Sequence, residues 1–211
     1  TVSLRDWDGF KEHLKKAEEA LVAAWKSNPE RPEAAELMIT VAMGMCGDDK
    51  ERMWFDRVVQ AQFDYLPAYD SLLWAMRPRW GGSHREMYAF GNECLDTKRF
   101  ETWVPWYLFN VAIKVGADLP DWKEAFRKPG FYERLCEMYE GYLREKPRFD
   151  PDSLFHSYYA ITAWICGHYD TARARLQASG GTLHLTAANR VGIEPRAVEG
   201  EILARTGTRS N

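Results

Sequence analysis

The segment 153–179, SLFHSYYAITAWICGHYDTARARLQAS, decides the fold of this chain. Its apolar residues recur at helical spacing until Gly167, which marks a turn, and Tyr169 then starts a second run of helix-forming residues. Small side chains such as Ala163 and Ala172 let two helices approach closely. The segment therefore predicts a helical hairpin.

Amphipathic helices that end at a proline-marked turn recur along the rest of the chain. Ala17, Leu21 and Ala24 share one helix face before Pro29. Strong helix formers fill the periodic segments, and sustained Val, Ile and Thr alternation, which is typical of strands, is almost absent. We therefore expect an all-α protein. The predicted helices cover residues 6–27, 32–42, 53–63, 67–76, 83–95, 100–114, 122–126, 132–143, the two arms of 153–179, and 196–205.

The length and composition indicate one folded domain. A chain of 211 residues is near the upper end of a single domain, so we expect one helical domain over 1–211, with a loose tail at 206–211. Hydrophobic residues make up 45% of the chain and aromatic residues 14%, including 9 Trp. This is too much apolar material for a disordered chain.

The charge balance argues against two classes of partner. The formal net charge is -3, so no general positive field favours a nucleic-acid backbone. No apolar run approaches the roughly 18 residues that a membrane span needs, so we expect no membrane partner. The start of the chain has no apolar core of a signal peptide. Because the chain does not begin with Met, removal of an N-terminal leader peptide stays an open alternative.

The four cysteines, Cys46, Cys94, Cys136 and Cys166, are widely spaced in apolar helical contexts. Buried free thiols have this distribution, which indicates a reducing compartment and a cytoplasmic protein. Their even number also suits disulfides, and the sequence alone pairs none of them.

Two segments resemble tetratricopeptide helices. The stretch from Ala17 to Pro29 and the stretch from Gly167 to Leu176 place small residues and one large apolar residue at the offsets of that repeat. The resemblance covers about half the chain. It implies helical hairpins stacked into a short right-handed solenoid, and such stacks usually bind partners.

The run from Leu73 to Ser83 resembles a motif of a bacterial family that has tetratricopeptide-like helices and no assigned reaction. The resemblance implies a bacterial origin and a helical repeat fold. It carries over no catalytic residue.

The end of this run gives the candidate binding site. Two glycines allow close approach of a ligand to the backbone, a serine opens a helix whose free N–H groups favour an anion, and arginines add positive charge. A tryptophan supplies a flat face for an apolar group or a cation. The candidate ligand-binding or partner-binding residues are Arg77, Arg79, Trp80, Gly81, Gly82, Ser83, His84 and Arg85.

A structural interpretation of the same residues stands beside this one. Pro78 and the glycines can shape a tight turn, Trp80 can fold back over it, and the arginines can pair with acids such as Asp70. Ser83 and Glu86 also have the spacing of a capping box, which would occupy the serine hydroxyl.

The sequence predicts no catalytic residue, metal or cofactor. The five histidines have no spacing that places two of them on one helix face, and Cys166 with His168 is the single close Cys/His pair. We expect Cys166 to belong to the core. No glycine-rich phosphate-binding motif of the Walker or Rossmann type occurs.

We therefore expect a non-catalytic interaction or scaffold module that binds a partner peptide or helix, with an unknown oligomeric state. The alternative is an anion or small-molecule sensor, or an enzyme, that uses Arg77 to Arg85. The rings of Trp103, Trp106, Tyr107, Phe109, Tyr158, Tyr159 and Trp164 suit the core between repeats, and some of them suit a partner-binding groove.

Overall fold

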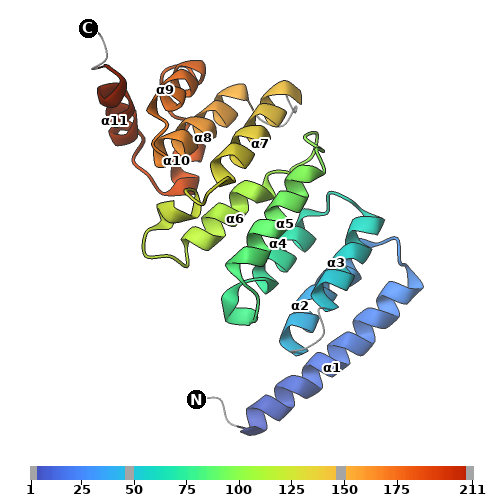
Figure 1. Ribbon diagram of the computed structural model, residues 1–211. Coiled ribbons are helices and arrows are strands. Elements are labelled where there is room, and N and C mark those ends of the chain that lie inside the picture. The colour runs from blue at the N-terminus through green and yellow to red at the C-terminus, as the bar shows by residue number, and fades with distance from the viewer. Residues whose placement is uncertain (1–3, 46–49, 146–150, 208–211) are drawn as a thin grey trace. The chain divides into compact units, whose positions relative to one another are not determined.

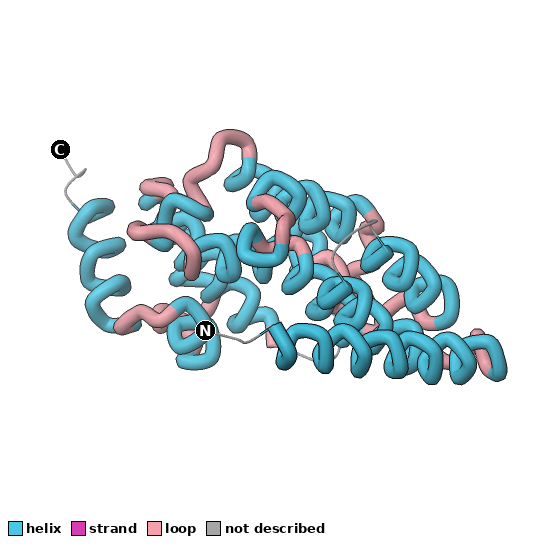
Figure 2. Tube along the Cα trace, turned by 90° about the horizontal axis from the view of Figure 1, so that it is seen from below, coloured by secondary structure: helices cyan, strands magenta, loops and turns pink. Residues whose placement is uncertain are grey.

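The structure is a computed structural model that describes residues 4–45, 50–145 and 151–207. Within these ranges the chain forms α-helices and two short 3-10 helices, and no strand (Figure 2). The prediction of an all-α protein is therefore confirmed for the described residues. None of the helices in these ranges has the length and apolar character that a bilayer-spanning segment requires.

The chain divides into two compact units, residues 1–90 and 91–211, and the division falls inside α5 (His84–Asp96). In the first unit α1 packs against α2, and α2 packs against both α3 and α4 (Figure 1). The elements before α5 are α1 (Leu4–Ser27), α2 (Pro32–Met45), α3 (Lys50–Ala61), α4 (Leu66–Ala75) and η1 (Pro78–Trp80).

The core of the first unit contains three aromatic rings from three helices. The ring centroid of Phe55 lies 4.8 Å from that of Tyr69 and 5.5 Å from that of Phe90, both edge to face. Aromatic rings prefer this geometry because the ring edge is positive and the face negative. The helix predicted over 32–42 is longer than expected, because α2 continues through Gly44, which we took as a helix-breaking residue, to Met45. Gly47, the second glycine expected to end this helix, lies outside the described residues.

In the second unit α8 is the central helix, and it packs against α7, α9, α10 and α11. The helical hairpin predicted for 153–179 is confirmed as α8 and α9. The elements are α6 (Tyr107–Gly116), η2 (Trp122–Ala125), α7 (Phe131–Glu145), α8 (Asp152–Ile165), α9 (Tyr169–Ala178), α10 (Leu185–Val191) and α11 (Pro195–Gly207) (Figure 1).

The aromatic core of the second unit forms around Trp106. Its ring centroid lies 4.8 Å from that of Tyr158, 5.1 Å from that of Phe109 and 5.8 Å from that of Phe155. Tyr142 stacks on Phe155 at 5.0 Å. The sequence left open whether the aromatic rings of this unit lie in the core or line a groove. Most of them are buried.

The predicted helix over 100–114 is wrong in its first half, because α6 starts only at Tyr107. Pro105 has no N–H to donate, which disfavours a helix through this segment. The backbone is instead held by Tyr142, whose hydroxyl donates to the carbonyl of Thr102 at 2.9 Å and accepts from the N–H of Trp106 at 3.1 Å. A tertiary contact thus adds to the local turn bonds of this segment, such as the one from Trp106 N–H to the Trp103 carbonyl at 3.2 Å.

The end of the chain also differs from the prediction. No helix was predicted at α10, whose first turn is fixed by the Nδ1 of His184 accepting from the N–H of Thr186 at 3.2 Å. The predicted helix over 196–205 is confirmed as α11. It continues through Thr206, a buried residue that the prediction assigned to the tail; residues 208–211 lie outside the described ranges.

We expect Tyr142→Phe to lower the free energy of unfolding by about 2 kcal/mol, because the Thr102 carbonyl would lose its partner in the core and Trp106 N–H would keep only its bond to the Trp103 carbonyl. Tyr139→Phe is the matched control on the same helix. The Tyr139 hydroxyl pairs with Oγ1 of Thr162 at 2.8 Å, and that hydroxyl can turn to a backbone carbonyl of its own helix, so we expect a loss of about 1 kcal/mol. Denaturant unfolding measures both, and equal losses would contradict the assignment.

Candidate functional site

The predicted site at Arg77 to Arg85 forms a tight turn between α4 and α5. Pro78 to Trp80 make the single turn of η1, and Gly81 ends it in the left-handed conformation with φ of 97°. Trp80, at the end of η1, has 48% of its surface exposed. His84 and Arg85 lie in the first turn of α5, His84 partly exposed and Arg85 exposed.

The two arginines of the turn approach one aromatic ring. The guanidinium carbons of Arg77 and Arg79 each lie 5.1 Å from the ring centroid of Trp74, a distance at which a cation is attracted to the ring face. Arg77 is also buried, with 6% of its surface exposed. These contacts give both side chains a structural role around Trp74.

Gly82 and Ser83 complete the turn. A Cβ on Gly82 would lie 2.2 Å from the carbonyl oxygen of Met76, so only glycine fits there without a backbone shift. The Ser83 hydroxyl accepts from the N–H of Glu86 at 3.2 Å and donates to its carboxylate at 2.8 Å. The serine half of the predicted capping box is thus present, and the two residues fit the turn-forming interpretation.

We expect Gly82→Ala to lower the melting temperature strongly, by several degrees or more, since about 2–4 kcal/mol of stability would be lost to the clash with Met76. Gly9→Ala in α1 is the control, because a Cβ there meets no atom within 4 Å and alanine favours the helix by about 0.5–1 kcal/mol. Calorimetry of the two variants checks this. A Gly82→Ala protein as stable as the parent would contradict the close approach.

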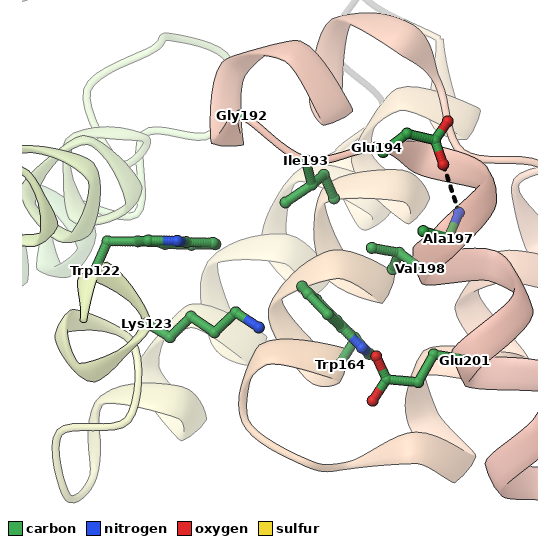
Figure 3. Close-up of a pocket in the computed structure, with 9 residues that line it drawn as sticks. All are labelled: Trp122, Lys123, Trp164, Gly192, Ile193, Glu194, Ala197, Val198 and Glu201. Carbon is green, nitrogen blue, oxygen red and sulfur yellow. Dashed lines mark hydrogen bonds between the residues drawn. The ribbon is translucent and has the colours of Figure 1, made fainter.

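A pocket in the second unit has the composition of a binding site. Its cavity volume is about 300 Å³, and its lining combines two indole rings with a lysine and two glutamates (Figure 3). We call it the indole pocket. Its lining residues are Trp122, Lys123, Trp164, Gly192, Ile193, Glu194, Ala197, Val198 and Glu201.

One wall of the indole pocket is η2, and its position is fixed by hydrogen bonds. Asp121 caps η2 by accepting from the N–H of Lys123 at 3.0 Å. Arg127, which follows η2, donates to the carbonyl of Ile165 at 2.8 Å and so ties the wall to the end of α8. These bonds hold Trp122 and Lys123 opposite Trp164.

The other wall is formed by the turn between α10 and α11 and by the first turns of α11. Gly192 ends α10 in the left-handed conformation, with φ of 78°, and directs Ile193 toward the pocket (Figure 3). Glu194 caps α11 by accepting from the N–H of Ala197 at 2.6 Å. The carboxylate of Glu194 is thereby directed toward the start of α11 and away from the two indole rings (Figure 3).

Lys123 lies between the two tryptophans. Its Nζ is 4.1 Å from the ring centroid of Trp164 and 5.9 Å from that of Trp122. Both distances are within the range of about 6 Å for attraction between a cation and a ring face. The pocket therefore already holds an ammonium group against an indole.

Glu201 supplies the negative charge at the base of the pocket. The Trp164 indole N–H beside the carboxylate lowers the pKa of Glu201 below its ordinary value (Figure 3). The Tyr169 hydroxyl, which donates to the same carboxylate at 2.9 Å, lowers this pKa further. Arg205 and Lys123 favour the same charged form. Trp164 thus uses its ring face toward Lys123 and its N–H toward Glu201.

The Cys166 and His168 side chains engage different partners. Cys166 is half-buried, its Sγ lies 3.5 Å from the carbonyl oxygen of Phe126, and burial raises the pKa of its thiol to about 12. At neutral pH the group is therefore a thiol and a weak nucleophile. The His168 ring stacks on Tyr132 at 4.0 Å.

Among the described residues no three His, Cys, Asp or Glu side chains gather in a metal-binding group.

Sequence reasoning found only part of the indole pocket. Trp164 was recognised as an aromatic candidate and Trp122 as an apolar helix edge, whereas Lys123 and Glu201 gave no signal. These residues come from η2, α8 and α11, and only the tertiary fold brings them together.

Comparison of the chain with protein-family models, with curated proteins and with solved structures finds no match. The resemblance to tetratricopeptide helices and to the motif at 73–83 therefore stays a prediction. The chemistry of the indole pocket follows from its own geometry.

We expect Trp164→Phe to raise the pKa of Glu201 toward its ordinary value, because the variant keeps an aromatic ring and removes an N–H donor. Since the folded-state pKa of Glu201 is lowered, its stabilising contribution is present above the unfolded pKa and is lost as pH falls through the folded pKa. A carbon-detected NMR titration of the glutamate carboxyl groups measures the shift. Trp122→Phe removes no donor to Glu201 and should leave the titration unchanged; the same shift in both variants would contradict the assignment.

Proposed function

We propose that this chain is a non-catalytic interaction module that binds a segment of a partner protein at the indole pocket. The observation that carries the proposal is the pocket itself, in which two indole rings and oppositely charged side chains of Lys123 and Glu201 surround an open cavity of about 300 Å³. Tryptophan rings anchor partners well, because they combine a large apolar surface with one polar group.

The packing of the helices supports the repeat architecture that we propose. α2 packs against both of the next two helices, α3 and α4, and α8 packs against α7 before it and α9 after it. Contacts between neighbours along the chain are typical of stacked helical hairpins. We infer a short right-handed solenoid of the tetratricopeptide-like class, as the sequence indicates.

The state of the titratable groups in and near the pocket favours binding over catalysis. Hydrogen bonds hold Glu201 as a carboxylate with a lowered pKa, and a general base works best when its pKa lies near the working pH. The raised pKa of Cys166 likewise leaves a protonated thiol. The free thiols of Cys94, Cys136 and Cys166 support a reducing, cytoplasmic setting.

We expect a library of short random peptides, selected on the immobilised full chain, to yield sequences that bind at the indole pocket. The affinity of these peptides for Trp122→Ala should be at least about tenfold lower, because loss of one large aromatic anchor costs roughly 2 kcal/mol or more. Fluorescence polarisation of labelled peptides measures this.

The matched control is Trp80→Ala, which removes an exposed tryptophan from the first unit, outside the pocket. Circular dichroism checks that both variants fold. Failure to select any peptide, or selected peptides that bind parent and Trp122→Ala equally, would contradict the proposed function.

A further inference from the structure

We propose that the indole pocket receives an alkylammonium side chain of the partner, and that Lys123 occupies its place in the free protein. This inference deepens the proposed function and rests on it. It starts from the Nζ of Lys123, which lies over the ring face of Trp164 at 4.1 Å (Figure 3). The position of this internal ammonium marks where a partner's cation would be stabilised.

The geometry around this position is that of a cation site. An indole face is electrostatically negative and attracts an ammonium group within about 6 Å. Trp164 offers one such face at 4.1 Å, and Trp122 offers a second ring at 5.9 Å. A cation between them lies against one indole ring and within the attraction range of the second.

The carboxylates give the pocket the charge that complements a cation. Glu201 lies beside the indole N–H of Trp164, whereas the Glu194 carboxylate points away from the rings toward the N–H of Ala197 (Figure 3). The carboxylate that can complement a cation near the rings is therefore that of Glu201. When Lys123 moves out toward solvent, the lining becomes more negative. An anionic ligand would face Glu201 at close range, and the repulsion would oppose its binding.

Lys123 can leave the pocket without disturbing the wall that carries it. The bond that caps η2 joins Asp121 to the backbone N–H of Lys123, so the side chain takes no part in it. Lys123 is also only partly buried, and its flexible stem can carry the ammonium into water. The exchange replaces one ammonium over Trp164 by another and keeps the two tryptophans in place.

An N-methylated ammonium fits this exchange better than a primary one. A primary ammonium is compact and strongly hydrated, so it loses much hydration when it enters an aromatic site. Quaternary ammonium groups are the cations that aromatic cages recognise best. We therefore expect a trimethylated lysine of the partner to displace Lys123 more readily than an unmodified lysine does.

The test uses three capped tripeptides with glycine on either side of the central residue. The central residue is lysine, trimethyllysine, or the carba analogue of trimethyllysine, in which carbon replaces the ammonium nitrogen and the side chain ends in a neutral tert-butyl group. Each is titrated into the full chain at constant ionic strength. The indole N–H signals of Trp122 and Trp164, assigned with single Trp→Phe variants, report binding by NMR.

We expect the trimethyllysine peptide to bind at least about fivefold more tightly than its carba analogue, which has the same shape and no charge. Lys123→Ala should tighten its binding by about threefold to tenfold, because the competing ammonium is gone. Lys128→Ala removes the same charge from an exposed position outside the pocket and should change binding by less than about twofold.

Glu201→Gln should weaken trimethyllysine binding by about threefold or more, and Glu124→Gln, on the exposed side of η2, should not. The proposal is overturned if the carba analogue binds as tightly as the cation, if Lys123→Ala leaves binding unchanged or weakens it, or if free choline binds and no peptide does. Stronger binding of an acetylated aspartate peptide, lost in Lys123→Ala, would instead make the pocket an anion site.

The outcome separates this inference from the proposed function. If selected peptides bind at the indole pocket through neutral side chains, the interaction module stands and the cation assignment falls. If neither selected peptides nor the three tripeptides shift the signals of Trp122 and Trp164, both fall.

Discussion

The burial of aromatic side chains with paired polar groups organises the second unit. Trp106, Tyr142 and Phe155 lie in mutual contact, and each polar atom that enters this cluster must find a partner because water is excluded. The Tyr142 hydroxyl meets this requirement by joining the carbonyl of Thr102 to the N–H of Trp106. One hydroxyl thus fixes an irregular segment against α7, and α6 starts from it.

The same aromatic packing also determines where the indole pocket lies, because it fixes the position of α8. The helix buries residues on nearly all sides, so its position in the second unit is closely determined. Trp164, in its last turn, is presented by a rigid element and is itself mostly buried, with 9% of its surface exposed. The other parts of the pocket are then assembled around Trp164, with Lys123 on its face and Glu201 at its N–H.

The sequence predicts a helix well where apolar residues recur at helical spacing over several turns and a glycine or proline marks the end. The hairpin around Gly167 and the final helix over 196–205 are examples, because helical periodicity is a local property. The segment 100–106 was wrongly predicted as helix because its apolar residues suit both a helix and an irregular buried segment. The contact that decides between them comes from Tyr142, far along the chain. α10 was missed because seven residues carry too few periodic positions.

The two candidate sites show why sequence reasoning found a motif and missed a pocket. Arg77 to Arg85 carries glycines, arginines and a serine in one short stretch, and these are also the residues that a tight turn requires. Gly82 faces the Met76 backbone, and both Arg77 and Arg79 approach Trp74, so local geometry accounts for much of the motif.

The indole pocket has the opposite character. Trp122, Trp164 and Glu201 are unremarkable in their own segments and acquire a common role only when η2, α8 and α11 come together. A site of this kind depends on side-chain chemistry at the surface of a packed helical unit, and a partner can be recognised there without any change in the core. In the recognition that we propose, one cation replaces another over an indole face that the fold has already placed.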